Sequence, residues 1–273
     1  MRLAFVGCGA AGRAVGLKWI EAGHTIRSVR ARTTAAAAVR ALGQGEPNGP
    51  LDTAAAVIFA TPDDALASVA EEYTLRADQL AVHLSGAHAS TILAPTGART
   101  ASLHPLRAFA DLEASVRELP DTYLFVEGDE GVEELARGLG GPVVRIDTDQ
   151  KTIYHAAAAI ASNYTVTLIQ IARDLFESVG VPPDDAHQAL VELVRGSVAN
   201  VAAVGLPDAL TGPAARGDVA LIRRHLAALD EPTRALYRHL LGATIPIARD
   251  KGGISADEAA QLEELADETG GSS

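Results

Sequence analysis

The chain of 273 residues is poor in several residue types that other classes of protein depend on. Its single cysteine, Cys8, rules out an intramolecular disulfide and is typical of a reducing compartment, so we expect a cytoplasmic protein. Lysine occurs only at Lys18, Lys151 and Lys251, which leaves three candidates for any mechanism that needs a lysine. The formal net charge of −12 argues against nucleic acid as a partner, because phosphate backbones are bound by concentrated positive charge.

Two further absences narrow the possible functions. No apolar run approaches the roughly 20 residues of a transmembrane helix, so we expect no contact with a membrane. No two histidines have the H-x-x-x-H spacing and there is no Cys-x-x-Cys, so we expect no metal centre. What the sequence does contain is abundant alanine, which favours helices, and short apolar runs that end at glycine or polar residues.

The order of these runs predicts two domains. Short apolar segments that alternate with helical segments are typical of buried parallel strands in a doubly wound sheet. After Asp147 the pattern is helical throughout, with one long helix predicted over residues 153–179. The sequence therefore predicts an α/β domain over residues 1–148, with a doubly wound parallel sheet, followed by an all-α domain over residues 149–273. Strands are predicted at residues 3–6, 24–29, 55–60, 80–84, 100–103, 123–126 and 143–146.

A glycine motif follows the first predicted strand and begins the first helix. Residues 7–12 form a G-x-G-x-x-G sequence, and this context makes the motif specific for dinucleotides. Gly7 permits a tight turn, Gly9 lets the backbone approach a pyrophosphate, and Gly12 lets the helix pack on the strand. The alternative is an ordinary glycine-rich turn. The residues predicted to bind the cofactor here are Gly7, Cys8, Gly9, Ala10, Ala11 and Gly12.

The residues after the second predicted strand favour NADP over NAD. An NAD site usually has an acidic residue there to bind the ribose 2′-hydroxyl, and this sequence has none. Arg32 can instead pair with a 2′-phosphate, with help from Arg30 and a hydroxyl bond from Thr33. Thr61 and Pro62 end a later strand at the edge where ligands bind in such sheets. They are predicted to line the cofactor site, although a simple strand-ending turn would explain them almost as well.

Two polar clusters at strand ends are candidates for the chemistry. Ser85 and His104 each lie just beyond a predicted strand, on the edge that carries the cofactor. A histidine there can polarise a carbonyl or transfer a proton at neutral pH. A structural histidine in a turn is the alternative for His104. His83 alternates within a strand pattern and is better explained as a core residue.

A third cluster begins the helical domain. Lys151, His155 and Asn163 fall along one helix face, with Ser162 beside Asn163 and alanines between them. His155 and Asn163 are roughly 12 Å apart by helical rise, so they could contact one substrate but not each other. A small-residue face that packs on the sheet is the alternative.

A fourth cluster lies in the loop from Leu210 to Asp218. Thr211 and Arg216 could bind a substrate carboxylate, although a plain turn between two helices is equally compatible with this segment. Asp218 is predicted to cap the next helix.

Taken together, these motifs resemble the NADP-binding 6-phosphogluconate-dehydrogenase-like superfamily. More narrowly, the chain resembles a group of Rossmann-like proteins with a C-terminal domain of unknown function, whose relatives include ketopantoate reductase, pyrroline-carboxylate reductase, hydroxyisobutyrate dehydrogenase and prephenate dehydrogenase. Ser85 and His104 match the serine and histidine that prephenate dehydrogenases place at the substrate. The lysine and asparagine that ketopantoate reductase has one turn apart are not matched, since Lys151 and Asn163 are twelve residues apart. The resemblance also implies a homodimer formed by the helical domain.

These observations predict an NADPH-dependent oxidoreductase that reduces the C=O or C=N bond of a small keto or imino acid, and the resemblance implies a ketopantoate-reductase-like activity with ketopantoate as the preferred example. His104 or His155 would supply the proton, with Lys151 as a further catalytic candidate. Ser85, Asn163 and Arg216 would position the substrate. Two alternatives remain: an NADP dehydrogenase of the prephenate or arogenate type, and a dinucleotide-binding or sensing protein without catalytic activity.

Overall fold

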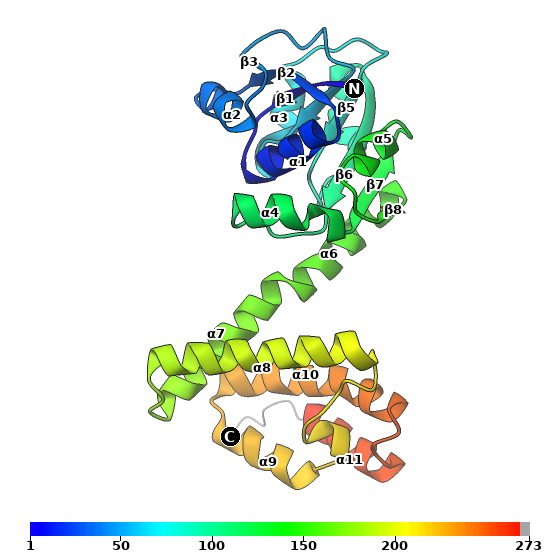
Figure 1. Ribbon diagram of the computed structural model, residues 1–273. Coiled ribbons are helices and arrows are strands. Elements are labelled where there is room, and N and C mark those ends of the chain that lie inside the picture. Colours follow the sequence, from blue (N-terminus) through cyan, green and yellow to red (C-terminus); the bar gives the residue numbers. More distant parts are fainter. Residues whose placement is uncertain (268–273) are drawn as a thin grey trace. The chain divides into compact units, whose positions relative to one another are not determined.

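The computed structural model describes residues 1–267 (Figure 1). The chain consists of two compact units, Met1–Asn163 and Tyr164–Ser273. The predicted boundary at residue 148 lies where the sheet has ended and continuous helical structure begins, whereas the division between compact units falls later in the chain. No helix in the described part of the chain is long and apolar enough to cross a membrane.

The first unit is built on an eight-stranded sheet with the order β3-β2-β1-β4-β5-β6-β7-β8. The predicted α/β class is confirmed, with one correction: β7 runs antiparallel to β6, while every other neighbouring pair is parallel. The short β3 lies in a segment whose Gly and Pro content predicts a loop. The strands are β1 (Arg2–Val6), β2 (Thr25–Arg30), β3 (Glu46–Pro47), β4 (Ala56–Phe59), β5 (Leu80–His83), β6 (Arg99–Pro105), β7 (Leu124–Gly128) and β8 (Val143–Arg145).

Helices cover both faces of this sheet. Leu3 and Phe5 of β1 point into one apolar core with residues of α1, α2 and α5, while Ala4 and Val6 point into a second core with residues of α3. This two-sided burial explains why the strands are continuous apolar runs. The α-helices of the first unit are α1 (Ala10–Glu21), α2 (Ala35–Leu42), α3 (Leu66–Glu71), α4 (Leu112–Glu118), α5 (Val132–Arg137) and α6 (Lys151–Ala161).

The helix predicted over residues 153–179 is two helices rather than one. Ser162 departs from helical geometry, with φ −107° and ψ −69°, so α6 ends at Ala161 and α7 (Asn163–Ser178) begins after it. A serine side chain competes with helical hydrogen bonding, which makes such an interruption easier to accommodate.

The second unit is helical, as predicted. Its core is formed by α9 (Val219–Ala228), α10 (Glu231–Asp250) and α11 (Ala256–Asp267), and the long α8 (Pro183–Val204) precedes them. The predicted cap of α9 is confirmed, because the Asp218 carboxylate accepts a hydrogen bond from the Leu221 amide at 3.0 Å. At the start of α11, the Ser255 amide donates to the Glu258 carboxylate at 2.7 Å, and the Glu258 amide donates to the Ser255 hydroxyl at 3.2 Å.

Candidate active site in the first unit

The glycine motif forms a tight turn between β1 and α1. Gly7 has a φ of +73°, and a Cβ there would lie 2.8 Å from the Ala60 carbonyl oxygen, so only glycine fits. A Cβ on Gly12 would lie 2.9 Å from the Cβ of Ala60, which accounts for the close packing of α1. Around Gly9, by contrast, a Cβ would meet no atom within 4 Å. The open space at Gly9 leaves the backbone accessible to a ligand, and this is the arrangement that a pyrophosphate requires.

A cleft of about 510 Å³ opens beside this turn. Eight of the residues predicted to bind the cofactor line it, whereas Ala10, Ala11 and Gly12 do not. Several other lining residues carry no recognisable signal in the sequence, because they come from the helices that flank the cleft. The predicted residues that line it are Gly7, Cys8, Gly9, Arg30, Arg32, Thr33, Thr61 and Pro62, and those not foreseen include Arg13, Ala37, Ala65, Val69, Glu72 and Tyr73.

The polar groups of the cleft fit a dinucleotide phosphate. Arg30 is already engaged, since its Nε donates to the Gly49 carbonyl oxygen at 2.9 Å and its guanidinium lies 5.9 Å from the centre of the Tyr73 ring. Arg32 therefore remains the stronger candidate for a phosphate. The Thr61 hydroxyl is buried and has no hydrogen-bond partner within the described residues. A bound ligand with a polar edge would satisfy that hydroxyl.

Cys8 is unsuited to nucleophilic chemistry. Burial raises the pKa of its thiol to about 11, and the nearby positive charge of Arg13 lowers it only in part. The thiol is therefore protonated at neutral pH, and only the thiolate is reactive.

A second pocket of about 410 Å³ brings together four of the predicted site residues, His104, His155, Ser162 and Asn163. The alanines of α6 contribute the small side chains that leave this space open, as the spacing of the sequence suggested. Arg107 lies two residues after the end of β6 and also lines the pocket, although the sequence did not predict it there. The remaining lining residues are Leu106, Ala108, Ala158, Ala159 and Ala161.

His104 is surrounded by aromatic side chains and a glycine. Its Nδ1 lies 2.6 Å from the Tyr154 hydroxyl oxygen, and the Tyr154 ring packs on Phe125 with centroids 4.4 Å apart. The rings of His104 and His155 have centroids 6.5 Å apart. Gly86 lies against both rings: a Cβ on Gly86 would be 2.8 Å from His104 Cε1 and 2.8 Å from His155 Nδ1. The absence of a side chain at Gly86 thus allows both histidine rings to lie close to the turn that follows β5.

The surroundings keep His104 uncharged. Burial lowers its pKa to about 4, and the positive charge of Lys151 acts in the same direction, while Asp63 opposes it. Burial raises the pKa of the Tyr154 phenol, so this residue remains protonated. The Nδ1 of His155 is buried without a hydrogen-bond partner in the described part of the chain.

Ser85 and Lys151 are close to this site but are not among the residues that line either cavity. The Ser85 hydroxyl accepts hydrogen bonds from the amides of Ala87 and His88, at 3.1 and 3.3 Å, and so fixes the turn that carries Gly86. Lys151 is buried, and its ammonium donates to the Ser102 hydroxyl. Burial lowers the Lys151 pKa to about 8, although the charges of Glu127 and Asp63 raise it in part.

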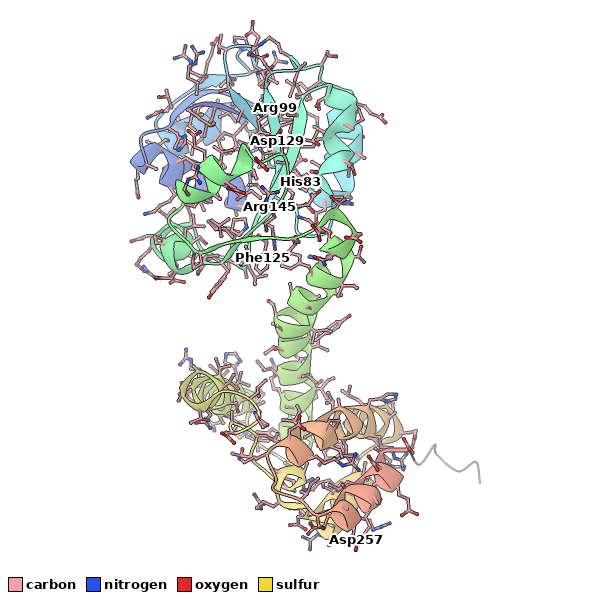
Figure 2. The ribbon with its side chains drawn as sticks, turned by 90° about the vertical axis from the view of Figure 1, so that its right-hand side faces the viewer. His83, Arg99, Phe125, Asp129, Arg145 and Asp257 are labelled. Atoms are coloured by element: carbon pink, nitrogen blue, oxygen red, sulfur yellow. The ribbon has the colours of Figure 1, made fainter. Side chains whose placement is uncertain are left out.

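His83 is a fully buried residue of β5, as its place in the strand pattern indicates (Figure 2). Its Nδ1 accepts a hydrogen bond from the Ser85 amide at 3.2 Å. Thr211 and Arg216 belong to the second unit, and their binding of a substrate stays a prediction. Over the described residues, no group of three or more His, Cys, Asp and Glu side chains is arranged to hold a metal ion.

Two family models match separate parts of the chain. Residues 2–85 match the family described as NADP oxidoreductase, coenzyme F420-dependent, and residues 122–244 match a domain of unknown function, DUF2520. No curated protein is significantly similar in sequence.

Solved structures with this fold cover almost the whole chain. Protein TM1727 from Thermotoga maritima is 25% identical with a TM-score of 0.77, covering 92% of this chain and 99% of that one. The provisionally named NADP oxidoreductase BF3122 from Bacteroides fragilis is 21% identical with a TM-score of 0.70, covering 92% and 97%. Plasmodium falciparum pyrroline carboxylate reductase, solved with NADP bound, is 12% identical with a TM-score of 0.54, covering 97% and 100%. The chain is thus similar to an NADP oxidoreductase domain over residues 2–85 and to the DUF2520 domain over residues 122–244, a match that takes in β7, β8 and helices that follow them.

Proposed function

We propose that the protein is an NADPH-dependent oxidoreductase that reduces the C=O or C=N bond of a small keto or imino acid. The observation that carries this proposal is the presence of two pockets at one edge of the sheet. The parallel neighbours β1, β4, β5 and β6 end at the same edge, which is where ligands bind in open α/β folds. At about 4.8 Å between strands, the end of β6 lies about 14 Å from the end of β1. Asp63, which directly follows Pro62 of the cleft, is near enough to influence the pKa of His104.

The cleft residues would hold the cofactor. The turn at Gly7 and Gly9 would receive the pyrophosphate, while Arg32 and Thr33 would bind the 2′-phosphate. The buried Thr61 hydroxyl would bond the half of the cofactor that lies toward β4 and β5. NADPH, when bound, supplies the hydride, and the carboxylate-free segment after β2 favours it over NADH.

His104 would activate the substrate as a neutral hydrogen-bond donor. In this proposal the Tyr154 phenol donates to Nδ1, which would place the ring proton on Nε2, the nitrogen that lies beside Gly86. With a pKa of about 4, only about one His104 in a thousand is protonated at pH 7, which makes it a weak source of protons. A protonated imine needs no such source, because hydride addition to its carbon yields a neutral amine directly. Imino acids are therefore the substrates we favour, and His155 is the proton donor for a ketone.

Asn163 and Ser162 would orient the substrate from the end of α6, since both line the pocket that contains His104. Arg216 and Thr211 of the second unit stay candidates for a carboxylate contact that this unit would contribute.

We also propose that the partner of this chain is a second copy of itself. Helix α8 leaves the aliphatic side chains of Leu193, Val198 and Val204 between 58% and 64% exposed, and together they give this helix an apolar surface. A homodimer formed through the second unit would cover that surface. Replacement of Val198 by Glu is expected to yield monomers in light scattering, whereas a wild-type protein that is already monomeric would exclude the dimer.

The cofactor assignment is tested by the binding of NADPH and NADH to the protein and to Arg32→Ala. Loss of a charged hydrogen bond costs about 1.5–3 kcal/mol, so the variant is expected to bind NADPH about 10- to 150-fold more weakly and NADH unchanged. Arg40→Ala is the control, because Arg40 is an exposed arginine of α2 that does not line the cleft. Equal binding of both dinucleotides to the wild type would refute the assignment.

The reaction is tested by NADPH oxidation with a panel of keto and imino acids. Turnover of any of these acids supports a reductase, and turnover of imino acids above keto acids supports the role given to His104. Tight NADPH binding without turnover would indicate a non-catalytic dinucleotide-binding protein. Activity found only with NADP⁺ and a prephenate-type substrate would indicate the dehydrogenase alternative.

A further inference from the structure

We infer that Arg107 binds the carboxylate of the substrate and so restricts the second pocket to acidic compounds. The inference rests on the proposed function for the reaction but concerns a residue to which nothing above assigns a role. Arg107 is the charged residue among those that line the described pocket, and the other lining residues are alanine, leucine, histidine, serine and asparagine. A cation with no acidic neighbour along the pocket wall is unusual in a chain whose net charge is −12.

The position of Arg107 is fixed by the backbone and by α4. Its amide donates to the Pro105 carbonyl oxygen at 2.8 Å, which places it in a turn three residues beyond His104. Its Nη2 donates to the Glu118 carboxylate at the end of α4. The side chain is 22% exposed, so it is largely removed from bulk water. An arginine tethered at one nitrogen loses less conformational entropy when it binds a second partner.

One donor of this side chain is unsatisfied. The Nε of Arg107 is buried and has no hydrogen-bond partner among the described residues. Guanidinium N–H groups are strong donors, and a buried one without a partner is costly in free energy. The planar fork of an arginine pairs with the two oxygens of a carboxylate, so an acidic ligand is the chemistry that satisfies it best.

The charge balance around Arg107 also favours an anion. The Glu118 carboxylate accepts hydrogen bonds from the guanidinium groups of Arg107 and, at 2.9 Å, Arg117. Both bonds lower the pKa of Glu118, and the bond from Arg107 has the larger effect. Two guanidinium groups thus share one carboxylate, which leaves one positive charge uncompensated. Arg117 is 66% exposed and does not line the pocket, so the excess charge is available to a ligand through Arg107.

The test compares Arg107→Met with Arg117→Met, which removes the other arginine on the same carboxylate. Each variant is assayed with a keto or imino acid and with the methyl ester of that acid, which has the same reacting carbon and no charge. Loss of a charge-assisted pair is expected to raise the KM for the acid by about 10- to 100-fold in Arg107→Met and to leave the KM for the ester unchanged. Arg117→Met should change neither value by more than about 3-fold.

A second measurement separates this inference from the reaction itself. 2-Hydroxybutanoate and proline cannot be reduced by NADPH, so their binding to the NADPH-loaded protein reports the site without turnover, and their carboxamides are the neutral counterparts. We expect the acids to bind the wild type and Arg117→Met and to lose that binding in Arg107→Met. Arg107→Lys, which keeps the charge and loses the fork, should recover part of it, and circular dichroism verifies that each variant is folded.

The outcomes distinguish the two proposals. Arg107-dependent binding of acids without turnover of any substrate would refute the reductase and support the carboxylate site. Turnover that is equal for acid and ester, and equal in Arg107→Met and wild type, would refute the carboxylate site and leave the reductase standing. Absence of any Arg107-dependent binding of either acid would likewise refute it.

Discussion

Gly86→Ala is the sharpest test of the pocket around His104. The added Cβ would lie 2.8 Å from His104 Cε1 and from His155 Nδ1, whereas carbon atoms pack at about 3.5–4.0 Å. Each ring must therefore recede by about 0.7 Å or more, or the chain at residue 86 must move. No positive φ is involved at this glycine, so the effect is steric and not a matter of backbone strain.

The magnitude follows from how strongly catalysis depends on position. Misplacement of a reacting group by about 1 Å lowers the rate by about 10²-fold, while overpacking by one methyl group destabilises a protein by about 1–3 kcal/mol. We expect Gly86→Ala to lower kcat/KM by about 100-fold at a temperature where it remains folded. The affinity for NADPH should be retained, because the glycine turn after β1 is untouched.

The assay measures NADPH oxidation and, separately, NADPH binding and the melting temperature. Gly196→Ala is the control, since a Cβ at Gly196 of α8 meets no atom within 4 Å, and it should leave activity unchanged. Wild-type kcat/KM in Gly86→Ala would show that neither histidine takes part in the reaction, and the mechanism proposed above would fail.

Three further predictions concern the cofactor turn, the core and a helix cap. Gly9→Ala should fold normally and lose NADPH binding in a titration, because its Cβ occupies only the space kept for a ligand; unchanged affinity would contradict this. Burial, helped by the charge of Lys151, lowers the His83 pKa to about 3, below the ordinary value of 6.5, so the unfolded chain takes up a proton that the folded protein does not as the pH falls from 6.5 to 3. The free energy of unfolding should therefore decrease by about 1.4 kcal/mol for each pH unit in this range because of His83. In denaturant unfolding, the free energy of His83→Gln should depend on pH less steeply than that of the control His239→Gln, by the same amount per pH unit. Asp218→Ala should reduce the free energy of unfolding by about 1 kcal/mol through loss of the cap of α9, and an unaltered denaturation midpoint would count against it.

The parts of the fold that the sequence predicted correctly are those that depend on residues close together in the chain. The strands of the sheet follow from apolar runs, and the cofactor turn follows from glycines whose roles are steric. The direction of β7 could not be predicted, because it depends on whether the segment before it crosses the sheet, and no residue type signals that path. The break at Ser162 was hidden for a similar reason, since a serine is tolerated within many helices.

The candidate site was predictable only in part, because helix periodicity gives a face and not what covers that face. Lys151 and His155 share one face of α6, yet Lys151 is buried against Ser102 while His155 reaches the pocket. The role proposed for Arg107 could not be predicted, because nothing in its local sequence distinguishes it from a surface arginine. Its significance comes from Glu118, which is near it only through the packing of α4.

The buried Lys151 gives this chain a built-in reporter of its own opening. Only 2% of the residue is exposed, and its pKa, which burial lowers to about 8, returns to the ordinary value of a lysine when opening brings water to the amine. An acylating reagent can reach Lys151 only when the first unit unfolds locally or globally. Lys18 and Lys251 are partly exposed and react without unfolding. Because the chain has three lysines, the extent of acylation at residue 151 over time, read by peptide mass spectrometry, is a direct measure of how often this part of the protein opens.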